Sequence, residues 1–273
     1  MINRTTGFAI SALVLAIGLT QASFVYADDC NKPEYQALLK IKNPDVLSRI
    51  NELNLTSDQK NKFKVMKSNF DAENKINGAT GKSINVQLNQ IATSSTIDEA
   101  RLDSIVSDAK KNMVIGQVRT ATLRHNLYNL LNDQQKIKYH ELQQQEEQSL
   151  HMSLQCPDIA KKTIYSHDLR NQVENLDLTE EQKSKIMPII SAFQDQIKKI
   201  MLQLNDSAMG VNQMEAQIVQ STSPIDSAKL QDFAMAQAET MAENIRSTVM
   251  TYHNIYENLN VQQKAQFMKI ISK

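Results

Sequence analysis

Hydrophobic residues recur with helical spacing over most of the chain. One series falls at i, i+3, i+4 and i+7, which is the apolar face of a helix: Ile186, Ile189, Ile190, Phe193, Ile197, Ile200, Met201 and Leu204. A second series has the same spacing: Leu102, Ile105, Ala109, Met113, Leu123, Leu127 and Leu130. Period-two runs of β-branched residues are absent, so we expect no strands. The pattern predicts an all-α fold.

Capping boxes predict where the helices begin. In such a box the N-cap side chain accepts from the N3 amide, and the N3 side chain accepts from the N-cap amide. The candidate pairs are Thr56 with Gln59, Thr96 with Glu99, Asn132 with Gln135, Thr179 with Gln182, Ser223 with Asp226, and Asn260 with Gln263. Pro224 would then occupy a first helical position. A helix over residues 56–93 would be about 55 Å long, so the shape should be elongated.

Two local features should disturb the long helices. Pro188 lies inside the apolar pattern and is expected to kink its helix, because it lacks an N–H and crowds the preceding turn. The stretch "NGATGK", residues 77–82, should weaken the helix that begins near Thr56.

The chain repeats itself. Leu55, Thr56, Gln59 and Lys60 recur at Leu178, Thr179, Gln182 and Lys183, an offset of 123 residues. "HNLYNLLNDQQK" from His125 recurs as "HNIYENLNVQQK" from His253, an offset of 128. These anchors indicate a tandem duplication with a small insertion in the second copy. We therefore divide the chain into residues 1–27, 28–151 and 152–273 and expect four helices in each copy.

The N-terminus has the features of an export signal. An apolar run at residues 8–19 follows Arg4, and "VYA" ends at Ala27 before two aspartates. This pattern predicts a signal peptide cleaved after Ala27, with a retained anchor as the alternative. In an oxidising compartment Cys30 and Cys156 are expected to form a disulfide, with two free thiols or an intermolecular bridge as alternatives.

Composition and motifs exclude several function classes. The chain has 30 basic and 30 acidic residues, so nothing in its charge demands nucleic acid. No GxSxG, HExxH or P-loop pattern occurs, so we expect no enzyme and no cofactor. His125 and His253 are equivalent in the repeat; they either fill helix contacts, which we favour, or contribute to a metal site. We predict no metal ligands.

Four phrases at expected helix starts carry a resemblance to a known family. They are Leu55-Thr56 with Gln59, Leu131-Asn132 with Gln135, Leu178-Thr179 with Gln182, and Leu259-Asn260 with Gln263. In an exported helical chain this arrangement resembles the Spy/CpxP family of bacterial periplasmic proteins, which carry LTxxQ motifs. The resemblance implies a cradle-like dimer of long helices. Here two tandem four-helix repeats would form an intramolecular pseudo-dimer, tied by a Cys30–Cys156 bridge.

The resemblance also implies two functions. The first is ATP-independent chaperone activity in the periplasm, in which unfolded or misfolded proteins are bound and their aggregation is suppressed. The alternative is an envelope-stress regulatory or sensor module that acts on the periplasmic domain of a sensor kinase and responds to metal. Neither involves nucleic acid or stable membrane insertion. Methionine either fills the core of an aromatic-poor helical protein, which we favour for most of these residues, or lines a surface that accepts many partners. The candidate client surface consists of Met201, Met235, Met241, Lys198 and Lys199.

Overall fold

The computed structural model describes residues 45–155, 165–221 and 223–272, and within these ranges the chain forms helices and no strands. The first group of elements is a 3₁₀ helix η2 (Val46–Leu53), α3 (Ser57–Ala92), α4 (Glu99–Leu130) and α5 (Asp133–Gln155). The second group is α7 (Tyr165–Glu174), α8 (Glu180–Gln220), α9 (Ser227–Glu257) and α10 (Val261–Ile271). The expectation of an all-α fold is therefore confirmed. The predicted signal peptide lies outside the described residues, as do Cys30 and Cys156 of the predicted disulfide.

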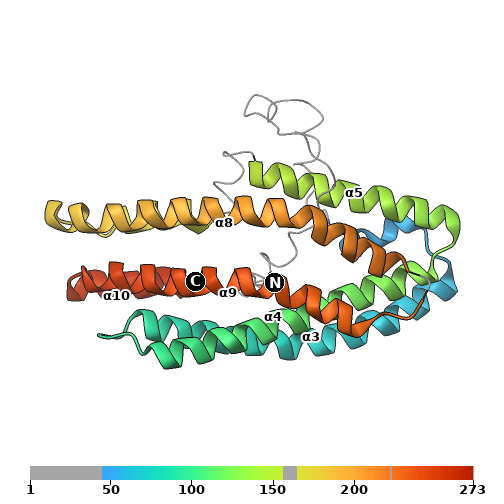
Figure 1. Cartoon of the computed structure of the whole chain (residues 1–273), viewed down its shortest axis with the longest axis horizontal. Coiled ribbons are helices and arrows are strands. Elements are labelled where there is room, and N and C mark those ends of the chain that lie inside the picture. The colour runs from blue at the N-terminus through green and yellow to red at the C-terminus, as the bar shows by residue number, and fades with distance from the viewer. Residues whose placement is uncertain (1–44, 156–164, 222, 273) are drawn as a thin grey trace.

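The long helices lie side by side and give the molecule an elongated shape (Figure 1). α3 packs against α4, and α8 packs against α9. The two hairpins meet through α4 and α9, while α3 also contacts α9 and α8 also contacts α4. As residue numbers rise along α4 from Glu99 to Lys110, those of their partners on α9 fall from Arg246 to Glu239, so the two helices are antiparallel.

The hydrophobic core is divided among several clusters. One cluster joins η2, α3, α4 and α5 around fully buried side chains such as Leu53, Leu127 and Tyr139. A second joins α7, α8, α9 and α10 around Ile186, Ile255 and Phe267. Between them, apolar residues of α3 and α4 pack on Ala238, Met241 and Val249 of α9. Each half thus has one helix cluster, in which short helices pack against the ends of long ones, and the hairpins connect the two clusters.

Each helix cluster also contacts the end of the hairpin of the other half. Val219, near the end of α8, packs in the cluster that contains η2 and α5. Near the end of α3, the Asn89 Nδ2 donates to the carbonyl of Ile271 in α10, 3.0 Å away. Contacts between the halves therefore occur at the hairpin tips as well as along α4 and α9.

Two of the predicted capping boxes are wrong. α4 begins after Asp98, whose carboxylate accepts from the amide of Arg101, and α9 begins after Asp226, which accepts from the amides of Ala228 and Lys229. The expected N-caps, Thr96 and Ser223, precede both helices, and Pro224 is not a first helical residue. The negative charge of each aspartate favours the helix N-terminus more than a hydroxyl does.

The glycines in "NGATGK" do not interrupt α3. Gly81 faces α4, where a Cβ would lie 3.3 Å from the Asn112 Nδ2. Gly116 of α4 faces back, where a Cβ would lie 3.1 Å from the Asn77 Nδ2. The two glycines let α3 and α4 approach closely, which offsets their low helix propensity. α8 likewise continues through Pro188 as a single helix.

Candidate functional site

The LTxxQ phrase of the first half joins two helix starts. Thr56 caps α3, and its hydroxyl accepts from the amide of Gln59 at 3.3 Å. The Gln59 Oε1 accepts from the Thr56 amide at 2.9 Å. At the start of α5, Asn132 and Gln135 exchange the same two bonds, both at 2.9 Å. Leu55 and Leu131, which precede the two caps, are both buried.

The two motif glutamines then bond to each other. The Gln59 Nε2 donates to the Gln135 Oε1 at 2.8 Å, and the Gln135 Nε2 donates to the Gln59 Oε1 at 3.0 Å. The second proton of each amide goes to a backbone carbonyl, that of Leu130 for Gln59 and that of Asn54 for Gln135. Both amides therefore use their full donor and acceptor capacity.

The second half builds the same arrangement. Gln182 and Gln263 exchange amide bonds of 2.7 and 3.0 Å, and each accepts from the amide of its own N-cap, Thr179 or Asn260. The free proton of Gln182 goes to the carbonyl of Asn258. The Gln263 Nε2 also lies within hydrogen-bond distance of the carbonyls of Leu176 and Asp177. Leu178 and Leu259 are buried beside the caps.

In both helix clusters, a residue with a left-handed backbone conformation precedes the long helix. Asn54 has a φ of 49° and Asp177 a φ of 51°, a region that non-glycine residues other than Asn and Asp rarely adopt. This turn aims the carbonyl of each residue at the amide of the distant glutamine. All these polar groups form hydrogen bonds within their helix cluster. The motif residues therefore hold helices together, and the side-chain amides of the four motif glutamines have no donor or acceptor left for a ligand.

A different part of the molecule has an exposed apolar surface. Along the outer face of α3, five apolar side chains lie within one stripe and are exposed: Val65, Ala72, Ile76, Ala79 and Val86. Val65 is 63% exposed and Ile76 is 69% exposed, values that are high for side chains of this kind. Their spacing of seven, four, three and seven residues keeps them on one side of the helix.

Lysines follow one edge of this stripe. Lys64, Lys75 and Lys82 are exposed and occupy neighbouring angular positions on α3. Within the part of the chain that the structure describes, none of the three has an acidic partner at ion-pair distance. We call the apolar stripe together with these three lysines the α3 surface. It presents both apolar area and uncompensated positive charge.

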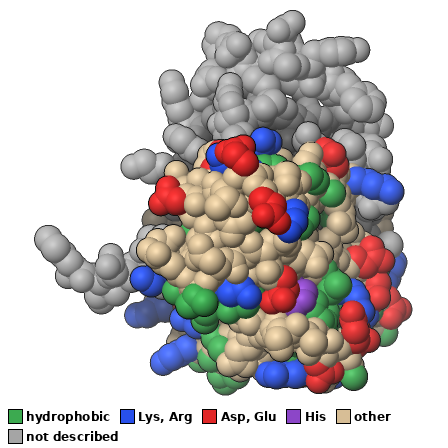
Figure 2. Space-filling model, turned by 90° about the vertical axis from the view of Figure 1, so that its left-hand side faces the viewer, with side chains coloured by type: hydrophobic (Ala, Val, Ile, Leu, Met, Phe, Trp, Pro, Cys, Tyr) green, Lys and Arg blue, Asp and Glu red, His purple; other side chains and the backbone are tan. Residues whose placement is uncertain are grey.

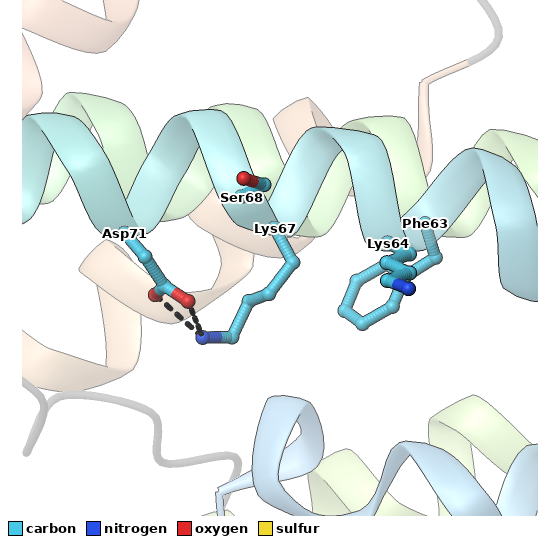
Figure 3. A pocket seen from close by; sticks show the side chains of 5 residues that line it. All are labelled: Phe63, Lys64, Lys67, Ser68 and Asp71. Atoms are coloured by element: carbon cyan, nitrogen blue, oxygen red, sulfur yellow. Dashed lines mark hydrogen bonds and ion pairs between the residues drawn. The ribbon is translucent and has the colours of Figure 1, made fainter.

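A shallow hollow of about 410 Å³ lies beside this surface (Figure 3). It is lined by Phe63, Lys64, Lys67, Ser68 and Asp71, all from α3. Lys67 and Asp71 form an ion pair at 2.5 Å along one side of the hollow. The ring of Phe63 gives the hollow an apolar wall, so it extends the α3 surface toward the start of the helix.

The methionine surface predicted from sequence is wrong in one member. Met241 is only 5% exposed and packs in the core between α3, α4 and α9. Met235 is 44% exposed and Lys199 is exposed, whereas the side chains of Lys198 and Met201 lie outside the described part. The prediction for Met241 is wrong because this residue lies on the face of α9 that packs against the other half of the molecule. The sequence alone does not show that α9 has such a face.

The second half of the chain matches a known protein-family model. Residues 164–270 match the family described as LTXXQ motif family protein. This region is similar to the LTXXQ motif family. The match contains α7 to α10 and agrees with the resemblance to Spy/CpxP proteins. Searches of curated proteins and of solved structures find no significant match.

LTXXQ proteins are typically periplasmic. Among the described helices of this chain, none is both long and apolar enough to cross a membrane. At the end of the molecule seen in Figure 2, acidic and basic side chains are interspersed with small hydrophobic areas.

His125 and His253, which the sequence pattern predicts to be equivalent, have different surroundings. His125 is buried, and its Nδ1 lies 3.0 Å from the carbonyl of Ile218 near the end of α8. Its Nε2 lies 3.0 Å from the Asn129 Nδ2. His253 is half-buried, and its Nδ1 is a buried atom without a hydrogen bond. The described residues contain no group of three His, Cys, Asp or Glu side chains placed to hold a metal.

A third histidine links the halves near the same helix end. The His140 Nε2 lies 3.2 Å from the hydroxyl of Tyr128, and its Nδ1 accepts from the Gln220 Nε2 at 3.2 Å. Burial lowers the pKa of His140 and raises the pKa of Tyr128, for which Asp133 is a smaller cause. The neutral imidazole is thus the form that fits the contact with α8.

We expect the protein to lose stability on mild acidification. A lowered folded-state pKa of His140 means that the unfolded chain binds the proton more tightly, so this contribution is lost as the pH falls below about 6.5. Thermal unfolding at about pH 7.5 and about pH 5.5 measures the effect. His140→Met introduces the residue found at the equivalent Met268 and should reduce the difference. An unchanged difference would remove His140 as its source.

Proposed function

We propose that this protein is an ATP-independent periplasmic chaperone that binds unfolded or misfolded proteins and limits their aggregation. The observation that carries the proposal is the α3 surface, where exposed Val65, Ile76 and Val86 form an apolar stripe beside unpaired lysines. Unfolded chains expose apolar and acidic segments that such a surface can bind reversibly. The family match of residues 164–270 supports the same class of protein.

We further propose that the two halves form an intramolecular pseudo-dimer. Contacts between them occur in equivalent pairs: α3 with α9 matches α8 with α4, and α4 with α9 is its own equivalent. The two helix clusters contain the same pair of hydrogen-bonded amides, Gln59 with Gln135 and Gln182 with Gln263. The pairs of sequence anchors at offsets of 123 and 128 residues agree with this arrangement. One chain would then supply the elongated surface that the resemblance assigns to two.

The binding surface can be tested by polar substitution. The triple variant Val65→Ser, Ile76→Ser and Val86→Ser removes the stripe and should weaken apparent client binding about tenfold, which corresponds to roughly 1.4 kcal/mol of lost contact. The measurement is light scattering of an aggregating reduced client at increasing concentrations of the chain without residues 1–27 and without ATP. Circular dichroism establishes that the variant stays folded.

A matched control uses exposed apolar residues elsewhere. Ile115, Ile137 and Val261 are 44%, 62% and 87% exposed, and they lie on α4, α5 and α10. Their triple replacement by serine should leave client binding unchanged if the α3 surface carries it. Equal loss in both triple variants would contradict the assignment to α3. A wild-type protein that does not suppress aggregation would contradict the chaperone proposal and favour the alternative regulatory module.

The three lysines make a separate contribution that depends on salt. Lys64→Glu, Lys75→Glu and Lys82→Glu together should slow capture of an acidic client and remove most of the salt dependence of capture, because steering by exposed charges is screened. Stopped-flow binding of an acidic client at low and high salt measures this. A basic client should be captured faster by the same variant; an equal slowing of both clients would contradict an electrostatic role.

A further inference from the structure

The contact between α4 and α9 has charges that are placed for pairing unlike halves. Arg246 of α9 forms ion pairs with both Glu99 and Asp103 of α4. Farther along, Lys110 of α4 forms an ion pair with Glu239 of α9. All these pairs cross between the two halves, and each joins a basic residue of one helix to an acidic residue of the other.

The equivalent positions of the other half carry different residues. At the offset of 128, Arg246 corresponds to Val118 and Glu239 corresponds to Lys111. If the first half paired with a second copy of itself in the same geometry, Lys110 of each copy would therefore face Lys111 of the other. Two like-charge contacts would replace an ion pair, and Glu99 and Asp103 would face a valine. Such contacts disfavour the pair.

Self-pairing of the second half also loses these interactions. Glu99 and Asp103 correspond to Ser227 and Gln231, which would face Arg246 without a negative charge. Lys110 corresponds to Ala238, so Glu239 would lose its partner as well. Neither self-pair can reproduce the charge contacts that the structure shows between α4 and α9.

Another part of this contact is apolar and also one-sided. Ala121 and the partly buried Val118 of α4 pack on Leu230 and Phe233 of α9 and on Ile218 of α8. In the opposite direction along the helices, the corresponding region contains Arg246 with its two acidic partners. The ion pairs of Arg246 therefore occur at one end of the contact and not at the other, whereas a symmetric homodimer would have two identical ends.

We propose that the α4–α9 contact is a selective interface that accepts the opposite half of this chain and rejects a second copy of the same half. It rests on the pseudo-dimer proposed above and goes beyond the chaperone function, which does not require selectivity. The two halves have diverged so that each supplies what the other lacks, and exposed charges of opposite sign exclude the alternatives more than they add stability.

The test lets the halves choose their partners. A specific protease site is inserted between residues 157 and 164 of the full chain, the folded protein is cleaved under reducing conditions, and the cleaved protein is unfolded in urea and refolded. Native mass spectrometry then counts the pairs. We expect the mixed pair in about tenfold excess over either self-pair, since several exposed charge contacts each contribute modestly. Without selectivity the three pairs would form in statistical amounts.

Charge reversal provides matched variants. Lys110→Glu places two carboxylates together in the mixed pair and makes the self-pair of the first half attractive, so the excess should fall several-fold. Combining Lys110→Glu with Glu239→Lys restores the ion pair of the mixed pair and should raise the excess again, but only in part, because the self-pair of the first half stays attractive. Arg101→Glu, on the solvent face of α4, is the control and should leave the excess unchanged. In the uncut chain, thermal unfolding should show the same loss and rescue.

The outcomes separate the two proposals. Statistical pairing, or an excess that Lys110→Glu leaves unchanged, would overturn the selectivity of the contact while leaving the pseudo-dimer intact. Halves that do not associate at all would overturn both. Neither outcome depends on client binding, which the aggregation assay measures independently.

Discussion

Replacing Arg124 by alanine is expected to lower the free energy of unfolding by about 3 kcal/mol, because the change leaves a buried carboxylate without its cation. The side chains of Arg124 and Glu146 are 9% and 11% exposed, and the Arg124 NH2 lies 2.6 Å from the Glu146 Oε1. The same nitrogen lies 3.0 Å from the Asp45 Oδ1, at the N-cap of η2. The Glu146 Oε2 accepts from the amide of Val46 at 3.2 Å. This network fixes η2 against α4 and α5, so its loss should weaken the packing of η2 in the helix cluster of the first half.

A surface arginine on the same helix provides the control for Arg124. Arg119 pairs with Glu73 at 3.0 Å, with side chains 30% and 55% exposed. Arg119→Ala should therefore cost less than about 1 kcal/mol. Urea unfolding followed by circular dichroism measures both variants, since the chain has no tryptophan. Equal costs for the two variants would show that burial does not set the strength of the Arg124 contacts.

Gln135→Glu is the second change with a large expected effect, about 3 kcal/mol of unfolding free energy. A carboxylate accepts but cannot donate, so the bonds from residue 135 to the Gln59 Oε1 and to the Asn54 carbonyl are lost. The site is only 8% exposed, and two acceptor oxygens would face each other there. The same replacement at Gln263, which is 5% exposed, should have a similar cost.

The adjacent glutamines are matched controls. Gln134 and Gln262 precede the motif glutamines in sequence and are exposed in the first turns of α5 and α10. Gln134→Glu and Gln262→Glu should be neutral or slightly stabilising, because a negative charge near a helix N-terminus is favourable. The deficit of Gln135→Glu should shrink on acidification, since a protonated carboxyl regains one donor. A deficit that does not depend on pH would contradict the lost-donor explanation.

Part of this structure could be read from sequence because it depends on short segments. Thr56 with Gln59 and Asn260 with Gln263 form capping boxes where the three-residue spacing predicts them. At α4 and α9 the same reasoning chose the wrong cap, because Thr96 and Asp98 are both suitable local candidates. In the structure the carboxylate of Asp98 caps α4 by accepting from the amide of Arg101. Local rules are thus reliable only where one candidate is available.

The α3 surface could not be predicted from local sequence patterns in this way. Met241 and Met235 have similar flanking residues, yet Met241 is buried against α3 and α4 while Met235 is exposed. The apolar stripe of α3 has helical spacing, which in a sequence is the usual sign of a core-facing side. Only the position of α4, on the side of Ile84 and Leu88, shows that the stripe from Val65 to Val86 faces outward.

The sequence by itself determined the helical class, the LTxxQ helix starts and the recurrence of the motif, because caps and periodicity arise from residues within one or two turns. The tertiary structure alone decided what the motif glutamines bind. Gln59 and Gln135 are 76 residues apart, and Gln182 and Gln263 are 81 apart, so their amide pairs form only when distant helix starts meet. It also decided which apolar faces are covered and which charges of α4 meet α9, since both depend on the packing of one hairpin against the other.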